Sequence, residues 1–249
     1  MRGGEAGRGR LFPGAAAILA DLDGCLVSGG AALPGAAAFA AAAGPRLWIV
    51  SNNSSDSEAT LADRLARLDV AVPPERMALA GAQTLRRLAA ARPGARVALF
   101  AAPPLHGLAE ALGLRLDAER ADIAILARDP GFDLAALTRL LALLHRGAAL
   151  IATNTDQAHP GPGGAPAPET GALLAAVRAA RPGTRARSLG KPAPDLLRLA
   201  IAGANAAPEA CVFVGDNAAT DGRAAAAAGV AFIRVDPASG TAPLLTEAA

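Results

Sequence analysis

Short apolar runs that end in polar residues recur along the chain, and they predict buried parallel strands. Four such runs stand at residues 17–20, 47–50, 211–214 and 230–233. Continuous apolar runs of this length are typical of strands that helices cover on both faces. Stretches in which apolar residues recur with helical spacing alternate with them, at 57–68, 193–202 and 220–228. The alternation favours an α/β fold built on an open, Rossmann-like parallel sheet.

The middle of the chain shows a second set of the same elements. Strand-like runs stand at 97–100, 123–126 and 150–152, and helical stretches stand at 82–91 and 134–144. Breaks rich in proline and glycine stand at 92–94 and 181–183, and a longer loop of this kind covers 159–168. We therefore predict an inserted α/β domain at 83–184 that divides the core into 1–82 and 185–249. The alternative is that the middle strands extend a single sheet.

The composition points away from membrane and secreted proteins. Of the 249 residues, 52% are hydrophobic, yet no apolar run approaches the roughly 20 residues that a bilayer requires. The start lacks the pattern of a signal peptide, and Cys25 and Cys211 cannot form a disulfide framework in a chain of this size. We expect a cytoplasmic protein in which residues 1–10 form a solvated tail; a phosphate-gripping arm or a transit peptide is the alternative for that segment.

The charge pattern disfavours nucleic acid as a partner. Lysine and arginine number 24 against 22 acidic residues, which leaves a net charge of only +2. The arginines are scattered along the chain, and aromatic residues do not alternate with them. A nucleic-acid surface would need a denser basic patch.

Polar side chains follow the first strand-like run at the point where it ends. Asp21 and Asp23 stand there with one residue between them, and Gly24 lets the chain turn sharply. Two carboxylates this close favour either a proton on one of them or a metal ion between them. A plain turn with side-chain-to-backbone hydrogen bonds is the alternative.

Three further polar segments make that alternative the weaker one. They are Ser51 with Asn52 and Asn53, then Lys191, then Asp216 with Asp221. Because the carboxyl ends of parallel strands meet at one edge of a sheet, these segments are expected to converge. Carboxylate oxygens favour Mg²⁺, which bridges carboxylate and phosphate. Together with an ammonium, a hydroxyl and amides, they form the environment that a transferring phosphoryl group needs.

In this order, the segments resemble the motifs of the haloacid dehalogenase superfamily of aspartate-nucleophile phosphatases. Asp21-Leu22-Asp23-Gly24 is similar to the first motif, Ser51 with Asn52 and Asn53 to the second, Lys191 to the third, and Gly215-Asp216 with Asp221 to the fourth. The insertion resembles the large cap of the branch that holds p-nitrophenyl phosphatases, pyridoxal phosphate phosphatases and phosphoglycolate phosphatases. Its segment Thr153-Asn154-Thr155-Asp156, followed by His159, resembles the substrate loop of that cap.

The resemblance implies a Mg²⁺-dependent phosphatase that acts on a small phosphorylated metabolite. Asp21 would attack phosphorus and become a phosphoaspartate, and Asp23 would serve as general acid and then general base. The implied phosphate- and substrate-binding residues are Ser51, Asn52, Asn53, Lys191, Asn154, Asp156 and His159. The implied holders of Mg²⁺ are Asp21, the backbone carbonyl of Asp23, Asp216 and Asp221, the last either through water or as a partner of Lys191.

Two other functions fit the same residues. One is a phosphotransferase or phosphomutase that uses the same phosphoaspartate, and the other is a catalytically idle sensor of a phosphorylated metabolite. Asp23 favours a phosphatase or a mutase, because relatives that preserve the phosphoaspartate carry threonine there. The substrate stays open among pyridoxal phosphate, phosphoglycolate, sugar phosphates and nucleotides. His159 favours pyridoxal phosphate, because an imidazole can contact its ring. Caps of this branch often pair subunits, which leaves a homodimer through the cap open.

Several candidates also have plainer interpretations. His159 fits an exposed loop histidine as well as a substrate contact, and Asn154 and Asp156 could cap a turn at a strand end instead of lining the entrance. Cys25 is interpreted as a small buried hydrophobe rather than a redox switch.

Overall fold

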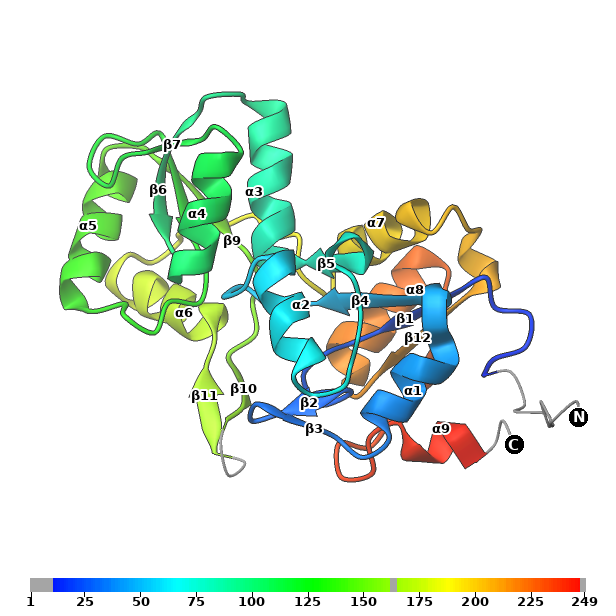
Figure 1. The fold of residues 1–249 in the computed structure, drawn as a ribbon. Helices are drawn as coiled ribbons and strands as arrows, with labels where there is room; N and C mark the ends of the chain where they lie inside the picture. The colour runs from blue at the N-terminus through cyan, green and yellow to red at the C-terminus, as the bar shows by residue number, and fades with distance from the viewer. Residues whose placement is uncertain (1–10, 162–164, 247–249) are drawn as a thin grey trace, which may run out of the picture.

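The computed structural model describes residues 11–161 and 165–246, so the tail expected at 1–10 lies outside the described residues. Within them the chain forms two parallel sheets, each covered by helices (Figure 1). The core sheet has the strand order β13-β12-β1-β4-β5, and every neighbouring pair is parallel. Its strands are β1 (Ala17–Ala20), β4 (Leu47–Ser51), β5 (Met77–Leu79), β12 (Cys211–Gly215) and β13 (Ala231–Arg234).

The central strand β1 is buried on both faces, which is why it appears in the sequence as a continuous apolar run. Side chains alternate along a strand, so Ile18 and Ala20 join one apolar layer and Ala17 and Leu19 the other. The first layer holds α1 (Ala36–Ala43) and α2 (Glu58–Ala66), and the second holds α7 (Asp195–Gly203) and α8 (Arg223–Ala228). A short hairpin, β2 (Val27–Ser28) with β3 (Ala31–Ala32), follows β1, and α9 (Ala242–Thr246) packs on α1.

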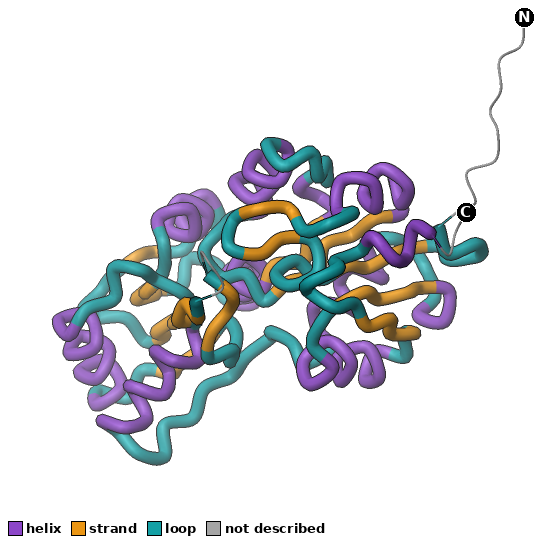
Figure 2. Tube along the Cα trace, turned by 90° about the horizontal axis from the view of Figure 1, so that it is seen from below, coloured by secondary structure: helices purple, strands orange, loops and turns teal. Residues whose placement is uncertain are grey.

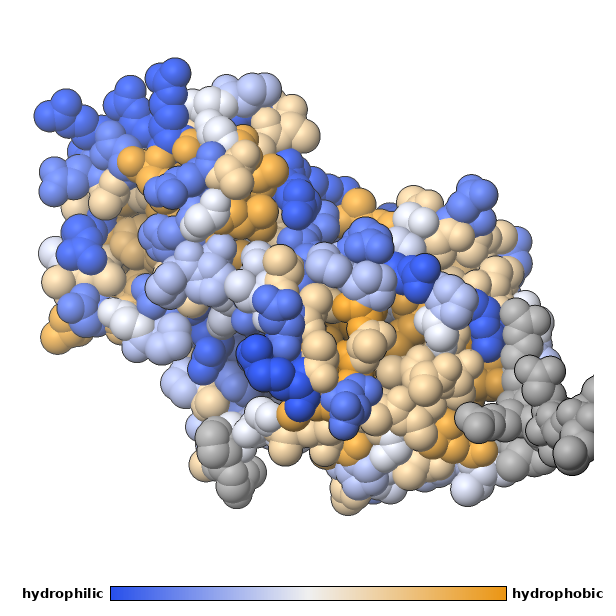
Figure 3. Space-filling model, in the orientation of Figure 1, coloured by the Kyte–Doolittle hydropathy of each residue, from blue (hydrophilic) through white to orange (hydrophobic). Residues whose placement is uncertain are grey.

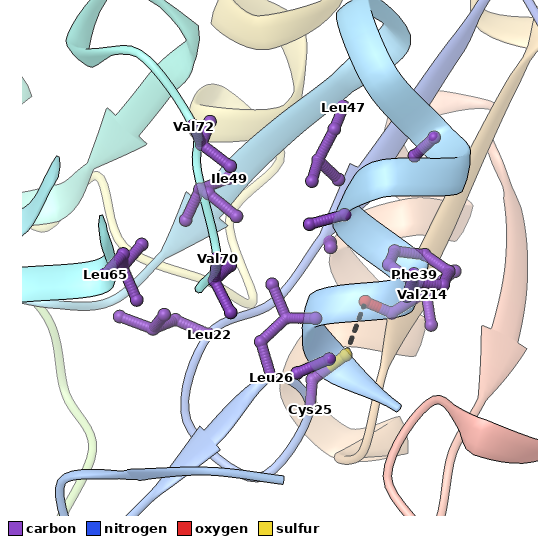
Figure 4. Close-up of a cluster of buried hydrophobic side chains, with 14 of the residues drawn as sticks. Leu22, Cys25, Leu26, Phe39, Leu47, Ile49, Leu65, Val70, Val72 and Val214 are labelled. Carbon is purple, nitrogen blue, oxygen red and sulfur yellow. Dashed lines mark hydrogen bonds between the residues drawn. The ribbon is translucent and has the colours of Figure 1, made fainter. Parts of the chain in front are cut away.

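Cys25 lies inside the first layer, among Leu22, Leu26 and Phe39 (Figure 4). Its Sγ donates to the carbonyl oxygen of Val214 at 3.7 Å. Burial, with a further contribution from Asp21 and its acidic neighbours, raises the pKa of the thiol well above its usual range. The side chain is therefore an uncharged thiol in an apolar layer, in agreement with the interpretation as a small buried hydrophobe.

The inserted residues form a second parallel sheet with the strand order β7-β6-β8-β9. Its strands are β6 (Arg96–Phe100), β7 (Arg115–Leu116), β8 (Ile123–Leu126) and β9 (Ala149–Ala152). One face is covered by α3 (Ala80–Ala91) and α4 (Pro103–Ala111), and the other by α5 (Leu134–His145) and α6 (Thr170–Ala180). We call this unit the cap. Within the described residues the two sheets share no strand, so the chain does not form one extended sheet.

The two units lie side by side, and Figure 2 shows the same division from below. The chain enters the cap through α3, which begins directly after β5. The domain boundary predicted between residues 82 and 83 therefore falls inside this helix. The other predicted boundary, between residues 184 and 185, falls in the segment that leads from α6 back to the core.

Several elements differ from their predicted ranges in the structure. Residues 159–168, predicted as a loop, contain an antiparallel hairpin of β10 (Ala158–Pro160) and β11 (Pro166–Pro168), although residues 162–164 at its tip lie outside the described residues. Prolines are tolerated there because both strands are edges. The helix predicted from residue 220 begins at Arg223, after a π-helical turn at Ala218–Gly222. The strand predicted at 230–233 is shifted by one residue, to Ala231–Arg234.

The surface differs between the two units. On the face that Figure 3 shows, hydrophilic residues gather at the outer end of the cap, whereas hydrophobic colours spread over the core around α1. Among the described helices, none combines the length and the hydropathy needed to cross a membrane.

Candidate active site

A cavity of about 410 Å³ lies between the carboxyl ends of the core strands and the cap. The core side of its wall is made by Asp21, Asp23, Ser51, Asn52, Asn53, Lys191, Asp216, Asn217 and Thr220. The cap side is made by Asp156, Gln157, Ala158, His159, Pro160 and Glu169. The structure thus brings together polar segments that stand far apart in the sequence.

Lys191 and two carboxylates form the buried centre of this cavity. Its Nζ donates to Oδ1 of Asp21 at 2.6 Å and lies 2.7 Å from Oδ1 of Asp221, and it sits 5.4 Å from the centre of the Phe213 ring. Lys191 is only 2% exposed and Asp221 is fully buried. Burial alone would lower the pKa of Lys191, but Asp21 and Asp221 outweigh it and raise that pKa above its ordinary value. The ammonium is therefore charged.

The pKa of Asp21 is raised in spite of that ammonium. Burial and then the nearby Asp221 raise the pKa of Asp21 well above its usual range, although Lys191 opposes them. Burial and Asp221 also raise the pKa of Asp216. Carboxylates that crowd together in this way are stabilised by a cation.

The donor set fits a divalent metal ion. One carboxylate oxygen each from Asp21, Asp216 and Asp221 lies within 4.8 Å of the others. Among the described residues, Oδ1 of Asp221 has no aligned hydrogen-bond donor, despite its closeness to Lys191. Carboxylate oxygens are the ligand type that Mg²⁺ prefers. Asp23 is outside this group of side chains, and a role for its backbone carbonyl stays a prediction.

Gly24 brings the loop after β1 close to the carboxylate cluster of Asp21, Asp216 and Asp221. Its φ is +83°, a left-handed conformation, and a Cβ at this position would overlap the carboxylate of Asp216. The amide of Gly24 donates to the carbonyl of Val27 at 2.8 Å. This bond closes the loop and occupies the Gly24 amide.

Asp23 lies on the cavity wall, beside rather than within the Asp21 cluster. Burial raises the pKa of its carboxyl, while His159, Arg64 and Lys191 lower it by smaller amounts. A carboxyl with a raised pKa can hold a proton at higher pH than an exposed aspartate. That property suits the general acid that the resemblance implies.

The residue that follows β4, Asn52, is hydrogen-bonded to the backbone of Lys191. Oδ1 of Asn52 accepts from the backbone N–H of Lys191 at 2.7 Å, and its Nδ2 donates to the Lys191 carbonyl at 3.0 Å. The side chain of Asn52 therefore holds the backbone of Lys191 through two hydrogen bonds, and Asn52 is a positioning residue. Ser51 Oγ accepts from the Asn53 N–H at 3.0 Å, which occupies that amide, and Nδ2 of Asn53 donates to Asp56 at 2.9 Å.

The predicted cap residues divide into two groups. Asp156 and His159 line the cavity, and Oδ2 of Asp156 accepts from Nδ2 of Asn52 at 2.9 Å, which ties the cap to the core. Asn154 lies behind the wall and is only 1% exposed, so it does not line the entrance. Its Oδ1 accepts from the Asp156 N–H at 3.0 Å, which agrees with the alternative of a turn cap. Its Nδ2 donates to the Asn52 carbonyl at 2.8 Å and to the hydroxyl of Ser54 at 3.2 Å. These buried bonds hold it in place.

Glu169 is a cavity residue that sequence reasoning did not single out. It precedes α6, and one of its oxygens accepts from the Thr170 N–H at 3.3 Å. Its other oxygen, Oε1, lies 2.9 Å from Nδ1 of His159 and 3.5 Å from Nε of Arg128. The Nδ1 contact is close but not aligned as a hydrogen bond. An acidic residue directly before an apolar helical stretch was the signal that could have found it.

Comparison with known proteins gives a consistent picture. The family model of haloacid dehalogenase-like hydrolases matches residues 15–229. The chain is 28% identical over 220 residues to the dihydroxyacetone phosphatase of Corynebacterium glutamicum, which covers 87% of this chain and 79% of that protein. It is 34% identical over 219 residues to chronophin of Mus musculus, which covers 82% of this chain and 75% of that protein.

Solved structures agree with these sequence relatives. Crystal structures of a glycerol phosphate phosphatase from Mycobacterium tuberculosis, in complex with calcium and with magnesium, superpose with a TM-score of 0.79 at 30% identity. They cover 88% of this chain, which spans 66% and 68% of the two solved chains.

Proposed function

Because the chain belongs to the family of haloacid dehalogenase-like hydrolases, we propose that it hydrolyses phosphate monoesters of small metabolites through a phosphoaspartate on Asp21. The observation that carries this proposal is the meeting of Asp21, Lys191 and Asp216 at one cavity beneath the cap. Named phosphatases among the relatives support the same reaction.

The residues divide the reaction into two displacements. In the first, a carboxylate oxygen of Asp21 forms a bond to phosphorus while the bond to the leaving oxygen breaks, and Asp23 gives its proton to that oxygen. In the second, Asp23 takes a proton from water, the water oxygen bonds to phosphorus, and the Asp21–phosphorus bond breaks. Lys191 and the hydroxyl of Ser51 stabilise the phosphoryl oxygens in both steps.

Mg²⁺ fits the three carboxylates of Asp21, Asp216 and Asp221. When bound, it offsets negative charge on Asp21 and on the phosphoryl oxygens, so that an anionic nucleophile can approach an anionic substrate. Asp221 has a second task, because its other close neighbour is the ammonium of Lys191.

The cap completes the site from the opposite side. Its contact from Asp156 to Asn52 joins it to the loop that holds Lys191. A covering unit of this kind excludes bulk water during the transfer and selects the leaving group.

The proposal is tested with p-nitrophenyl phosphate and purified protein, with and without Mg²⁺, beside the variant Asp21→Asn. We expect Mg²⁺-dependent release of phosphate by the natural chain and loss of at least about 10³-fold in the variant, since the nucleophile is removed. A natural chain as inactive as the variant would favour the idle sensor. Incorporation of labelled oxygen from water into phosphate separates hydrolysis from a phosphotransferase, which passes the group to an acceptor instead.

Two finer expectations accompany this function. We propose pairing of two chains through the cap, which light scattering during size-exclusion chromatography tests directly. A cytoplasmic location is likewise an expectation, tested by fractionation of cells that express the chain.

A further inference from the structure

The cap side of the cavity carries acidic groups and no permanent cation. Its described lining residues are Asp156, Gln157, Ala158, His159, Pro160 and Glu169. Burial lowers the pKa of His159, which favours the neutral imidazole near neutral pH. The non-phosphate half of a bound substrate therefore faces two carboxyl groups, an amide and an imidazole.

The cations near the cavity are already engaged elsewhere. Lys191, the one lysine or arginine among the described lining residues, lies between Asp21 and Asp221 on the core side. Arg128 approaches Glu169 at 3.5 Å, but Arg128 is not part of the wall. The carboxyl of Glu169 thus faces the cavity, with Arg128 beyond the lining.

Glu169 is held in this position by groups on three segments. Its backbone N–H donates to the carbonyl of Gln157 at 3.0 Å, and its side chain accepts from the Thr170 N–H at 3.3 Å. Arg128 in turn donates to the Pro168 carbonyl at 3.2 Å and to Oγ of Ser55 at 3.3 Å. Burial raises the pKa of Glu169 to about 7, although Arg128 and the Thr170 N–H oppose it. Once Glu169 is ionised, above about pH 7, a further negative charge beside this carboxyl is unfavourable.

Apart from the imidazole of His159, the described part of this wall offers no ring for an aromatic substrate to stack on. No phenylalanine or tryptophan belongs to the described lining, whose apolar part on the cap side consists of Ala158 and Pro160. Carboxylate and imidazole groups, in contrast, are good partners for hydroxyl groups.

We propose that Glu169 is a specificity-determining residue that selects phosphate esters of short, neutral, hydroxyl-bearing compounds and rejects esters that carry a second anionic group. The inference rests on the proposed phosphatase function and names the substrate class of that site. A hydroxyl of the leaving group donates to Glu169 or Asp156, whereas a carboxylate in the same place meets two acidic groups and no free cation.

The test compares two probes of nearly equal size, glycerol 3-phosphate and 3-phosphoglycerate, which differ by a hydroxymethyl group against a carboxylate. At pH 8, where Glu169 is largely ionised, we expect kcat/KM of the natural chain to be at least about tenfold higher for glycerol 3-phosphate. Glu169→Gln keeps the shape of the side chain and removes its charge, and we expect it to reduce this ratio several-fold, mainly through a lower KM for 3-phosphoglycerate. The matched control is Glu110→Gln, an exposed acid on α4 of the cap, which leaves the ratio unchanged.

Binding measurements keep this inference separate from the proposed function. Calorimetry with Asp21→Asn, which lacks the nucleophile, gives the affinity for both probes in the presence of Mg²⁺, with and without Glu169→Gln. A binding preference that Glu169→Gln removes supports the inference even if no variant hydrolyses anything, in which case the proposed function fails alone. Equal affinity for both probes, or a preference that Glu169→Gln leaves intact, overturns the inference even in an active enzyme.

Discussion

The ammonium nitrogen of Lys191 lies 2.7 Å from Oδ1 of the fully buried Asp221. Sequence reasoning left two roles open for Asp221, a metal ligand through water or a partner of Lys191. The structure makes it a partner of Lys191 and also places it within 4.8 Å of Asp21 and Asp216. Asp221 thus contacts the ammonium of Lys191 and also belongs to the carboxylate cluster that could hold a metal ion.

Replacing Lys191 by methionine should destabilise the fold, because it leaves Asp21 and Asp221 buried without their cation. Removing one partner of a buried pair costs about 3–5 kcal/mol, so we expect a loss of this order in the free energy of unfolding measured with urea in metal-free buffer. Mg²⁺ should restore part of it. The matched control is Arg87→Met, which breaks the exposed pair with Asp195 at 2.7 Å and should cost less than about 1 kcal/mol. Equal effects of both variants would contradict the buried role of Lys191.

Adding Mg²⁺ should stabilise the natural chain against thermal unfolding. At 100 times the dissociation constant, a ligand that binds only the folded state contributes about 2.7 kcal/mol. Asp216→Asn removes one of the three clustered carboxylates and should weaken this response by at least about tenfold in Mg²⁺ affinity. Asp122→Asn, an exposed acid of the cap, serves as control and should respond like the natural chain. Identical melting shifts in all three proteins would argue against a metal at this cluster.

Gly24→Ala separates backbone strain from damage to the site. Gly24 and Gly94 both have a positive φ, +83° and +70°, so alanine at either position should cost about 1–2 kcal/mol. Only at Gly24 would the new Cβ overlap the carboxylate of Asp216, because nothing lies within 4 Å of a Cβ built at Gly94. We therefore expect Gly24→Ala alone to lose Mg²⁺-dependent activity, by about 10²-fold or more, when initial rates of the two variants are compared.

Glu169 should make the stability of the fold depend on pH. Its pKa is about 7 in the folded chain, against an ordinary value of 4.5, and burial is the main cause. The folded state thus binds the proton more tightly, and the associated stability is present below pH 4.5 and lost as the pH rises through about 7. Glu169→Gln imitates the protonated carboxyl and does not titrate. The free energy of unfolding of this variant, minus that of the natural chain, should therefore increase by an amount on the order of 2 kcal/mol from pH 5 to pH 8.

Denaturation curves at several pH values check this expectation. Glu110→Gln, which changes an exposed carboxyl, should give a difference that does not vary with pH. A constant difference for Glu169→Gln as well would show that Glu169 titrates like an exposed residue.

The core strands were predictable because burial on both faces produces continuous apolar runs. β1 occupies the predicted residues 17–20, and β12 and β4 extend their predicted runs by one residue. The fifth core strand, β5 (Met77–Leu79), was not predicted, because three residues are too few to give a recognisable hydrophobic pattern. The β10–β11 hairpin was not predicted, because its prolines and glycines indicate a loop when only the local sequence is considered. The hairpin forms because the two segments pair with each other in the folded chain.

By itself, the sequence determined the α/β class and the family of the chain, since its polar motifs follow apolar runs in a characteristic order. The tertiary structure decided the rest, because burial and charge depend on what meets across the cavity. It turned Asn52 into a clamp for Lys191, placed Asn154 behind the wall, and brought Glu169 beside His159. Spacing along a chain carries no information about which groups lose their water together, and that loss of water sets the pKa of Glu169.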